Sequence, residues 1–317
     1  MKKTILITGG SGFLGRHLAA KLKNQYNVII GARNNGINRR AEELTGCEST
    51  PLDITNINSI NDAFNLYKPD IVIHAAATKY VDTSEKFANE CVDVNVIGSS
   101  NVSRVSIDKG VETVIGISTD KTAPPVFNTY GLTKALMERL FTSLDDKLST
   151  KFSCVRFGNI VWSTGSVFPI WEQMIQDYGL IKSTGPEMKR FFFTVDEASN
   201  LVIRALLNID SIHGKVLVQR MKYAQIKDIL DVFCECYKTT WERTKTRDGD
   251  KLDEYLVGIL ENEYTVELEV DNCSHYLIDY KNKQKNYVKE PFSTINAEHH
   301  SKKEILALIS SKPEFIL

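Results

Sequence analysis

Ile5-Leu6-Ile7-Thr8-Gly9-Gly10-Ser11-Gly12-Phe13-Leu14-Gly15 decides the fold of this chain. A short apolar run leads into a turn rich in glycine, and a segment of helix length follows. Gly10, Gly12 and Gly15 match the pattern G-x-G-x-x-G, while Gly9, Gly12 and Gly15 match G-x-x-G-x-x-G. In either register the glycines let the backbone turn tightly and approach a pyrophosphate, which the N-terminus of the helix then faces. The stretch predicts a dinucleotide site at the end of a buried first strand.

The first half of the chain alternates between strand-length apolar runs and helix-length segments. The expected strands lie at 4–7, 27–30, 71–74, 113–117 and 153–156, and the expected helices at 12–23, 57–67, 89–109 and 129–144. Such alternation with short connections indicates a parallel sheet with helices on both faces. Right-handed crossovers then make the sheet doubly wound. We therefore predict an α/β fold with a doubly wound parallel Rossmann sheet.

The second half of the chain predicts a smaller C-terminal substrate domain interleaved with this sheet. Turn-rich breaks occur at 163–166 and 183–186, and residues 245–296 are polar and rich in turns. Between these segments, a helix at 197–207 and a strand at 215–218 return to the alternation. The expected division is 1–162 and 193–220 for the nucleotide-binding Rossmann domain, and 163–192 and 221–317 for the substrate domain.

Composition narrows the class of protein. The 317 residues include 42% hydrophobic and 25% charged residues, as in soluble globular proteins. Lys and Arg number 39 against 40 Asp and Glu, so no overall charge attracts nucleic acid or an anionic membrane. No apolar run approaches the ~20 residues that cross a bilayer. The six scattered cysteines suggest neither a disulfide framework nor a metal site. We expect a cytoplasmic protein.

Several residues are candidates for contacts with the cofactor. No Asp or Glu ends the second expected strand to bind a ribose 2′-hydroxyl, whereas Arg33 could pair with a 2′-phosphate, which favours NADP over NAD. Asp53 could accept a hydrogen bond from adenine or could cap the next turn. Small residues close the fourth strand, where a backbone passes near the cofactor. The further candidates are Gly9, Ser11, Gly12, Phe13, Leu14, Gly15, Ala75, Ala76 and Ala77.

Tyr130 and Lys134 form the most evident catalytic pair. They are four residues apart, so on a helix they share one face. A nearby ammonium lowers the pKa of a phenol, and a tyrosinate can take a hydroxyl proton while hydride leaves for a nicotinamide. Any helix can contain this spacing by chance. Its position after a glycine-rich nucleotide site and the strand-end Ser118-Thr119 favours the catalytic interpretation, with Tyr130 and Lys134 also contacting the cofactor.

These motifs together resemble the extended branch of the short-chain dehydrogenase/reductase superfamily, which uses NAD(P) to act on nucleotide sugars. More narrowly, the chain is similar to the soluble UDP-N-acetylglucosamine 4,6-dehydratases that also invert C5, the type that begins pseudaminic acid and related amino-sugar pathways in polysaccharide biosynthesis. The segments that carry this resemblance are 74–80, 90–101, 118–121, 130–134, 156–160, 165–167, 190–198 and 247–252. The resemblance implies a redox-neutral cycle in which NADP stays tightly bound.

The resemblance also implies roles for residues at the catalytic turn. Thr119 would hold the sugar 4-hydroxyl near Tyr130, Asp120 would protonate the departing 6-hydroxyl, and Lys121 would remove the C5 proton. Lys121 can act as a base only when partly neutral, which requires a pKa lowered by burial or by neighbouring cations. If these roles do not hold, Asp120 caps a turn and Lys121 is solvated.

Contacts with the substrate follow from the same resemblance. Asn159, Arg190 and Arg247 fall where the family holds the nucleotide diphosphate, although either arginine could instead form a surface ion pair. Lys79 is a candidate for both substrate and cofactor, and Asn95 for the cofactor.

The resulting prediction is a UDP-GlcNAc 4,6-dehydratase, an NADP-dependent lyase. Its product would be UDP-2-acetamido-2,6-dideoxy-β-L-arabino-hex-4-ulose. The alternatives are a non-inverting dehydratase, a UDP-sugar 4-epimerase, which does not need the Asp120–Lys121 pair, and a catalytically silent NADP-binding regulator. We expect a homo-oligomer formed through helices at 89–109 and 129–144, whose apolar positions could equally belong to the core.

Overall fold

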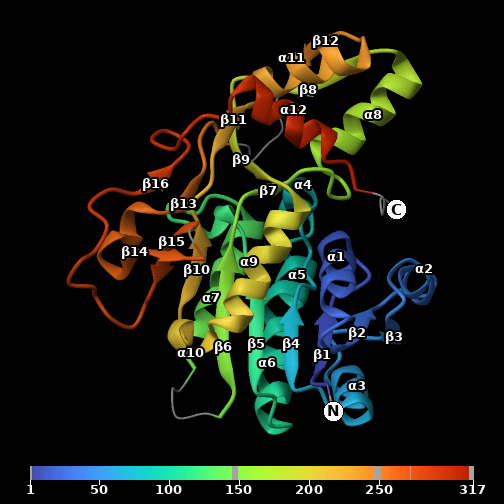
Figure 1. Cartoon of the computed structure of the whole chain (residues 1–317), viewed down its shortest axis with the longest axis vertical. Coiled ribbons are helices and arrows are strands. Elements are labelled where there is room, and N and C mark those ends of the chain that lie inside the picture. Colours follow the sequence, from blue (N-terminus) through green and yellow to red (C-terminus); the bar gives the residue numbers. More distant parts are fainter. Residues whose placement is uncertain (1, 145–148, 246–250, 272, 314–317) are drawn as a thin grey trace.

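The computed structural model describes residues 2–144, 149–245, 251–271 and 273–313. Within these residues the largest element is a nine-stranded sheet with the strand order β14-β15-β10-β6-β5-β4-β1-β2-β3 (Figure 1). From β10 to β3 in this order, neighbouring strands pair in parallel, and β15 and β14 add an antiparallel edge. This arrangement confirms the predicted α/β fold with a doubly wound sheet.

The central strands are buried along nearly their whole length because helices cover both faces of the sheet. Ile5, Leu6 and Ile7 of the first strand, for example, are all 0% exposed. The strands are β1 (Thr4–Thr8), β2 (Asn27–Ala32), β3 (Glu48–Pro51), β4 (Ile71–His74), β5 (Thr113–Ile117), β6 (Lys151–Arg156), β10 (Val216–Gln219), β14 (Thr265–Val270) and β15 (Cys273–Ile278).

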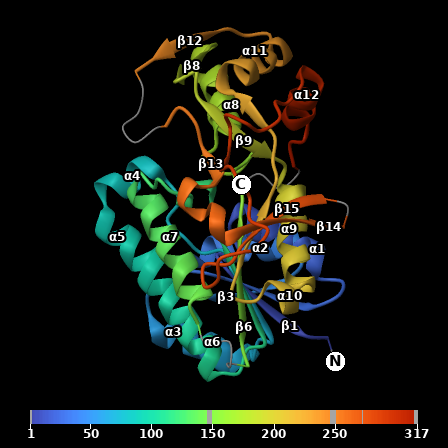
Figure 2. The same cartoon turned by 90° about the vertical axis from the view of Figure 1, so that its left-hand side faces the viewer.

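Two groups of helices cover the faces of the sheet. On one face α3 packs on α6 and α6 on α7, and on the other α1 packs on α9, as Figure 2 shows. The helices are α1 (Phe13–Leu22), α2 (Asn35–Thr45), α3 (Ile57–Tyr67), α4 (Val81–Lys86), α5 (Ala88–Val92), α6 (Ser99–Asp108), α7 (Thr129–Thr142), α9 (Val195–Leu207) and α10 (Ile209–Ile212).

A smaller lobe lies beyond the carboxyl ends of the parallel strands (Figure 1). Aromatic residues pack together in its core, where Trp162, Phe168, Trp171 and Phe233 contact one another. The elements of this lobe are β7 (Asn159–Ile160), α8 (Val167–Tyr178), β8 (Ile181–Thr184), β9 (Lys189–Phe193), β11 (Tyr223–Gln225), α11 (Ile226–Tyr237), β12 (Trp241–Thr244) and α12 (Lys302–Ser310).

The C-terminal segment contributes to both parts of the molecule. The strands β14 and β15 pair with each other in antiparallel fashion and extend the large sheet, although both lie within the predicted substrate domain. Next to the catalytic turn, β13 (Tyr255–Val257) pairs with β16 (Phe292–Ser293), and the short 3-10 helix η3 (Ile259–Tyr264) follows β13. The division into two domains stays a prediction.

The segment predicted as one helix at 89–109 is divided in the structure. It comprises α5, a π-helical stretch η1 (Asp93–Gly98) and α6. Wider turns of this kind occur often at functional sites, and this one carries the buried Asn95. In the part of the chain that the structure describes, no helix has the length and apolar character needed to span a membrane.

Candidate active site

The glycine-rich turn after β1 is tightly packed, which explains its composition. Gly9 has φ of +67°, and a Cβ there would lie 2.7 Å from the backbone nitrogen of Ala76. A Cβ on Gly15 would lie 2.5 Å from the carbonyl oxygen of Gly10. The backbone N–H of Gly10 donates to the carbonyls of Ile7 and Gly31, each at 3.1 Å. These contacts hold the turn against β2 and against the loop after β4.

The N-terminus of α1 fits an anionic group. The helix begins after Gly12, whose lack of a side chain leaves the first turn uncapped, and that turn carries no acidic residue. The first backbone N–H groups of a helix have no partner within it, and the helix dipole adds a partial positive charge there. Beside this turn the guanidinium of Arg16 donates to the carbonyl of Ser11 at 2.6 Å. A pyrophosphate suits this donor set.

Asn95 connects the loop after β4 to the catalytic helix. Its Oδ1 accepts from the backbone N–H of Thr78 at 2.9 Å, and its Nδ2 donates to the carbonyl of Thr78 and to Oγ1 of Thr133, both at 3.0 Å. The same loop is fixed to β1, because the N–H of Ala75 donates to the carbonyl of Thr8 at 3.0 Å. Asn95 thereby positions the loop of Ala75–Ala77, and a direct contact with the cofactor stays a prediction.

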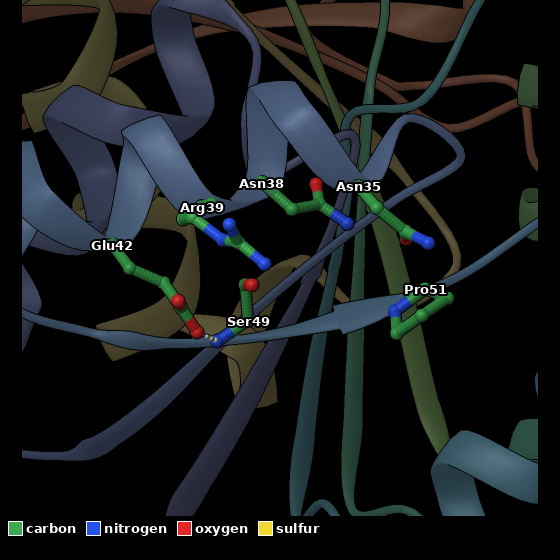
Figure 3. A pocket seen from close by; sticks show the side chains of 6 residues that line it. All are labelled: Asn35, Asn38, Arg39, Glu42, Ser49 and Pro51. Atoms are coloured by element: carbon green, nitrogen blue, oxygen red, sulfur yellow. Dashed lines mark hydrogen bonds between the residues drawn. The ribbon is translucent and has the colours of Figure 1, made fainter.

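Arg33 is exposed directly after β2. The Oδ1 of Asp53 accepts from the N–H and the hydroxyl of Thr55, at 2.9 and 2.8 Å, which is the turn-capping alternative considered for this residue. A pocket lies between α2 and β3 nearby (Figure 3). It is lined by Asn35, Asn38, Arg39, Glu42, Ser49 and Pro51.

The catalytic turn follows β5 as the short 3-10 helix η2 (Asp120–Thr122). Nζ of Lys121 lies 2.9 Å from Oδ1 of Asp120, and the hydroxyl of Thr119 donates to the same oxygen at 2.9 Å. The side chain of Asp120 is 0% exposed and that of Lys121 is 16% exposed. The other carboxylate oxygen of Asp120 is buried and has no hydrogen-bond partner among the described residues. The pair is thus neither a turn cap nor solvated.

Tyr130 and Lys134 lie on the first two turns of α7, which Asn128 caps by accepting from the N–H of Gly131 at 2.8 Å. Burial raises the pKa of Tyr130 to about 12, although the charge of Lys121 and a hydrogen bond with Thr119 act to lower it. The expected fall of this phenol pKa toward neutrality is therefore not produced by the protein's own charges.

Lys134 is a buried amine with a weak partner. Its Nζ donates to the thioether sulfur of Met137 at 3.0 Å, and the side chain is almost fully buried. Burial lowers the pKa of Lys134 to about 8. A thioether is a poor acceptor for an ammonium, so the hydroxyl groups of a dinucleotide ribose fit the remaining donors. This observation and the uncapped N-terminus of α1 agree with a nicotinamide dinucleotide.

Glu254 is a charged residue of the site that the sequence did not reveal. Its Oε1 lies 3.9 Å from Nζ of Lys121 and 3.8 Å from Nε of Arg190, and its side chain is 4% exposed. Burial alone would lower the pKa of Lys121, but the charges of Asp120 and Glu254 outweigh it and raise the pKa. The lowered pKa expected for Lys121 is thus wrong, because two carboxylates surround the amine. The only signal in the sequence is an acidic residue directly before the apolar run 255–257.

The structure brings some of the predicted substrate residues together. Arg190 is buried on β9, where its Nη1 donates to the carbonyl of Lys189 at 2.8 Å. Asn159 on β7 donates to the carbonyl of Phe191, on the same strand as Arg190, at 3.1 Å. Lys79 lies on the loop after β4 and donates to the carbonyl of Thr164 at 2.6 Å. Arg247 lies outside the described residues.

A buried ionic cluster is hydrogen-bonded to residues at both ends of the catalytic turn. Glu138, on the same helix as Lys134, accepts from the hydroxyls of Ser118 and Thr122 at 2.5 and 3.1 Å. Its carboxylate pairs with Arg156 at 2.7 Å, and Arg156 also pairs with Glu261 of η3 at 2.8 Å. The cluster therefore joins both ends of the turn to α7, to β6 and to the C-terminal segment.

Comparisons with known proteins agree with this geometry. Residues 5–275 match the family described as polysaccharide biosynthesis protein. The chain is 34% identical over 282 residues to the uncharacterized membrane protein MJ1061 of Methanocaldococcus jannaschii. The matched residues are 84% of this chain and 83% of that protein. It is 28% identical over an alignment of 340 residues, covering 99% of each protein, to a UDP-N-acetylglucosamine 4,6-dehydratase (inverting) of Campylobacter jejuni. The X-ray structure of Pen from Bacillus thuringiensis matches with a TM-score of 0.89 and 27% identity over 98% of each chain.

Other relatives carry a different activity or a longer chain. A UDP-glucose 4-epimerase of Rickettsia bellii is 31% identical over 304 residues, 90% of this chain and 86% of that protein. The probable polysaccharide biosynthesis protein EpsC of Bacillus subtilis is 36% identical over 213 residues, and the matched part is 36% of its length. Similarity alone therefore does not choose between dehydration and epimerisation.

Proposed function

The chain belongs to the polysaccharide biosynthesis protein family, and from this premise we propose that it is a UDP-N-acetylglucosamine 4,6-dehydratase that inverts C5. The observation that carries the proposal is the buried pair Asp120–Lys121, 2.9 Å apart, at the carboxyl end of β5. A 4-epimerase needs a group that takes the 4-hydroxyl proton. A dehydratase also needs an acid for the departing 6-hydroxyl and a base for C5, and this pair supplies both.

Oxidation at C4 is the task of Tyr130, with Thr119 beside it. Tyr130, as the tyrosinate, takes the proton of the sugar 4-hydroxyl, and Thr119 holds that hydroxyl in place. When bound, oxidised NADP would supply the hydride acceptor for C4 and, once reduced, the hydride donor for C6, and its positive charge would favour the tyrosinate. Tyr130 is partly exposed, so a sugar hydroxyl can reach its phenol.

Elimination of the 6-hydroxyl is the task of Asp120 and Lys121. One proton moves from Nζ of Lys121 to the carboxylate of Asp120, which gives a neutral acid and a neutral amine. Lys121 then takes the C5 proton while Asp120 gives its proton to the departing 6-oxygen, and water leaves. This step restores the carboxylate and the ammonium, the ion pair that the structure contains. The partner-free oxygen of Asp120 is the one available for the 6-hydroxyl.

The cofactor is a nicotinamide dinucleotide, and we assign it as NADP. Arg33 stands directly after β2 without an acidic residue beside it at the strand end, and Arg39 and Arg40 on α2 are also exposed. An arginine suits a 2′-phosphate, whereas a carboxylate would be needed for the 2′-hydroxyl of NAD. Asp53 and the loop of Ala75–Ala77 complete the proposed contacts.

The substrate is proposed to lie between the large sheet and the smaller lobe. Arg190 and Asn159 are the proposed contacts of its diphosphate, and Lys79 contacts substrate or cofactor from the loop after β4. Arg247 belongs to the same proposal on the resemblance alone. Guanidinium groups bind phosphate oxygens through two parallel hydrogen bonds, which suits the diphosphate of a UDP-sugar.

The protein is proposed to act as a homodimer. Large apolar side chains are exposed directly before α5 and along α5, η1 and α7, and these three elements pack on one another. They are Phe87 at 59% exposure, Val92 at 40%, Ile97 at 48%, Leu132 at 56% and Leu136 at 48%. Contiguous exposed apolar residues of this kind are typical of protein interfaces, and a second copy would bury them symmetrically. The cytoplasmic location stays a prediction.

Proton NMR of the purified protein with UDP-GlcNAc in D2O, without added cofactor, tests the proposal. The expected result is a new 6-methyl signal, loss of the C5 proton signal and couplings of the L-arabino sugar. Couplings of the D-xylo sugar would keep dehydration and remove the inversion. A 4-epimer without a 6-methyl signal would replace the proposal with an epimerase, and no change with added NADP would leave a silent binder.

A further inference from the structure

Glu254 lies between two cations of the candidate site. The same carboxylate oxygen, Oε1, is 3.9 Å from Nζ of Lys121 and 3.8 Å from Nε of Arg190. The residue comes from the C-terminal segment just before β13, while Lys121 follows β5 and Arg190 lies on β9. Three parts of the chain that are distant in sequence therefore meet at this oxygen.

The position of Glu254 is fixed by its backbone. Its N–H donates to the hydroxyl of Thr294 at 3.2 Å, and its carbonyl accepts from the N–H of Thr294 at 2.9 Å. The side chain is 4% exposed, so water screens its charge little. The pair of bonds to Thr294 leaves the carboxylate directed at Lys121 rather than at solvent.

We infer that Glu254 is a positioning residue that holds Lys121 as an ammonium beside Asp120, and so sets the pH range in which Lys121 can remove the C5 proton. The inference rests on the proposed function. An anion about 4 Å from an ammonium stabilises the charged form. Transfer of a proton from Lys121 to Asp120 neutralises both groups and takes the ammonium away from the Glu254 carboxylate, so Glu254 opposes that transfer.

Other charged groups near the amine of Lys121 also influence its protonation. Asp120 is its direct partner, Arg190 repels it, and Tyr130 lies close enough for Lys121 to influence the phenol. Lys251 faces Glu254 from the same segment and opposes its influence. Removing the charge of Glu254 therefore shifts Lys121 toward the neutral amine, with Asp120 still in place.

Glu254→Gln removes the charge and keeps the shape. With UDP-GlcNAc, the expected result is that the alkaline limb of the kcat–pH profile, where the Asp120–Lys121 pair loses its proton to solvent, moves about one to three units to lower pH. A purely structural role would lower kcat at every pH without moving the limb. Asp253→Asn is the matched control: this neighbouring carboxylate pairs with Lys189 at 3.2 Å and accepts from Thr294 at 2.9 Å. Its profile should keep the wild-type limb.

A second measurement does not depend on turnover. Lysines are reductively methylated with 13C-formaldehyde, and the Lys121 signal, assigned by its loss in Lys121→Arg, is titrated by NMR. Glu254→Gln should lower its midpoint by about one to three pH units, and Glu254→Asp, with the carboxylate withdrawn by one methylene, should lower it less. An unchanged midpoint in both variants overturns the inference. A shifted midpoint without a 6-methyl product overturns the proposed reaction and keeps the electrostatic role of Glu254.

Discussion

Replacing Arg156 by methionine removes the cation that forms ion pairs with two buried carboxylates. Arg156 pairs with Glu138 at 2.7 Å and with Glu261 at 2.8 Å, and the side chains are 0%, 1% and 2% exposed. Breaking a buried ion pair by removing one partner costs about 3–5 kcal/mol, because the remaining charge stays buried without compensation. Against a typical free energy of unfolding of about 5–15 kcal/mol, this is a large fraction. We expect Arg156→Met to fold with a markedly lower urea midpoint.

Arg243→Met provides the control for that measurement. Arg243 pairs with Glu187 at the similar distance of 2.8 Å, but these side chains are 59% and 45% exposed. Exposed pairs contribute about 0–1 kcal/mol, since water screens them. Circular dichroism during urea unfolding of both variants should therefore separate them clearly. Equal midpoints for the two variants would refute the assignment of Arg156 as the centre of a buried cluster.

The pH dependence of this difference has a definite sign. Burial alone would raise the pKa of Glu138, but Arg156 and the hydroxyl donors outweigh it and lower the pKa below its ordinary value of 4.5. The pair therefore stabilises the folded wild-type protein above pH 4.5, and this contribution is lost as the pH falls through the lowered pKa. In Arg156→Met burial raises the pKa instead, so the variant gains relative stability on acidification. The gap between the two proteins should narrow from pH 7 to about pH 5.

Three further substitutions test separate parts of the account. Asp120→Asn should lower formation of the 6-methyl product by about 10²–10⁴-fold while the bound dinucleotide, followed by its absorbance, is retained; unchanged product formation would exclude Asp120 as the acid. Arg33→Ser should weaken NADP about 10-fold or more and leave NAD nearly unchanged in calorimetric titrations, and equal effects on both would contradict a 2′-phosphate contact. Leu132→Glu should convert a dimer to a monomer in sedimentation equilibrium without changing the circular dichroism spectrum, whereas a persistent dimer would place the interface elsewhere.

Much of the fold follows from patterns within single segments. The apolar runs of β1, β4 and β5 are continuous because both faces of each strand are buried. The glycines of the turn after β1 are required because the neighbouring backbone is too close for a side chain. The π-helical stretch η1 was not predicted, since its apolar spacing also suits an ordinary helix. The strand β14 alternates in sequence, but nothing local indicates that its partner β15 pairs with β10.

The residues of the candidate site that belong to short sequence motifs could be predicted. Thr119, Asp120 and Lys121 lie together on one turn beside Tyr130, as the sequence indicated. Glu254 could not be predicted, because it reaches Lys121 from 133 positions further along the chain through a contact of the folded state. The raised pKa of Lys121 was not foreseen, since Asp120 and, from this distant segment, Glu254 both act on the amine against its burial.

The central claim is that the protein moves a hydride within one sugar, from C4 to C6. UDP-GlcNAc deuterated at C4 tests it most directly, with the product analysed by NMR and mass spectrometry in ordinary water. The account predicts a 6-methyl group that carries the deuterium as CH2D, with none left at C4. A 4-epimer that keeps its deuterium at C4 and lacks a methyl group would contradict the account.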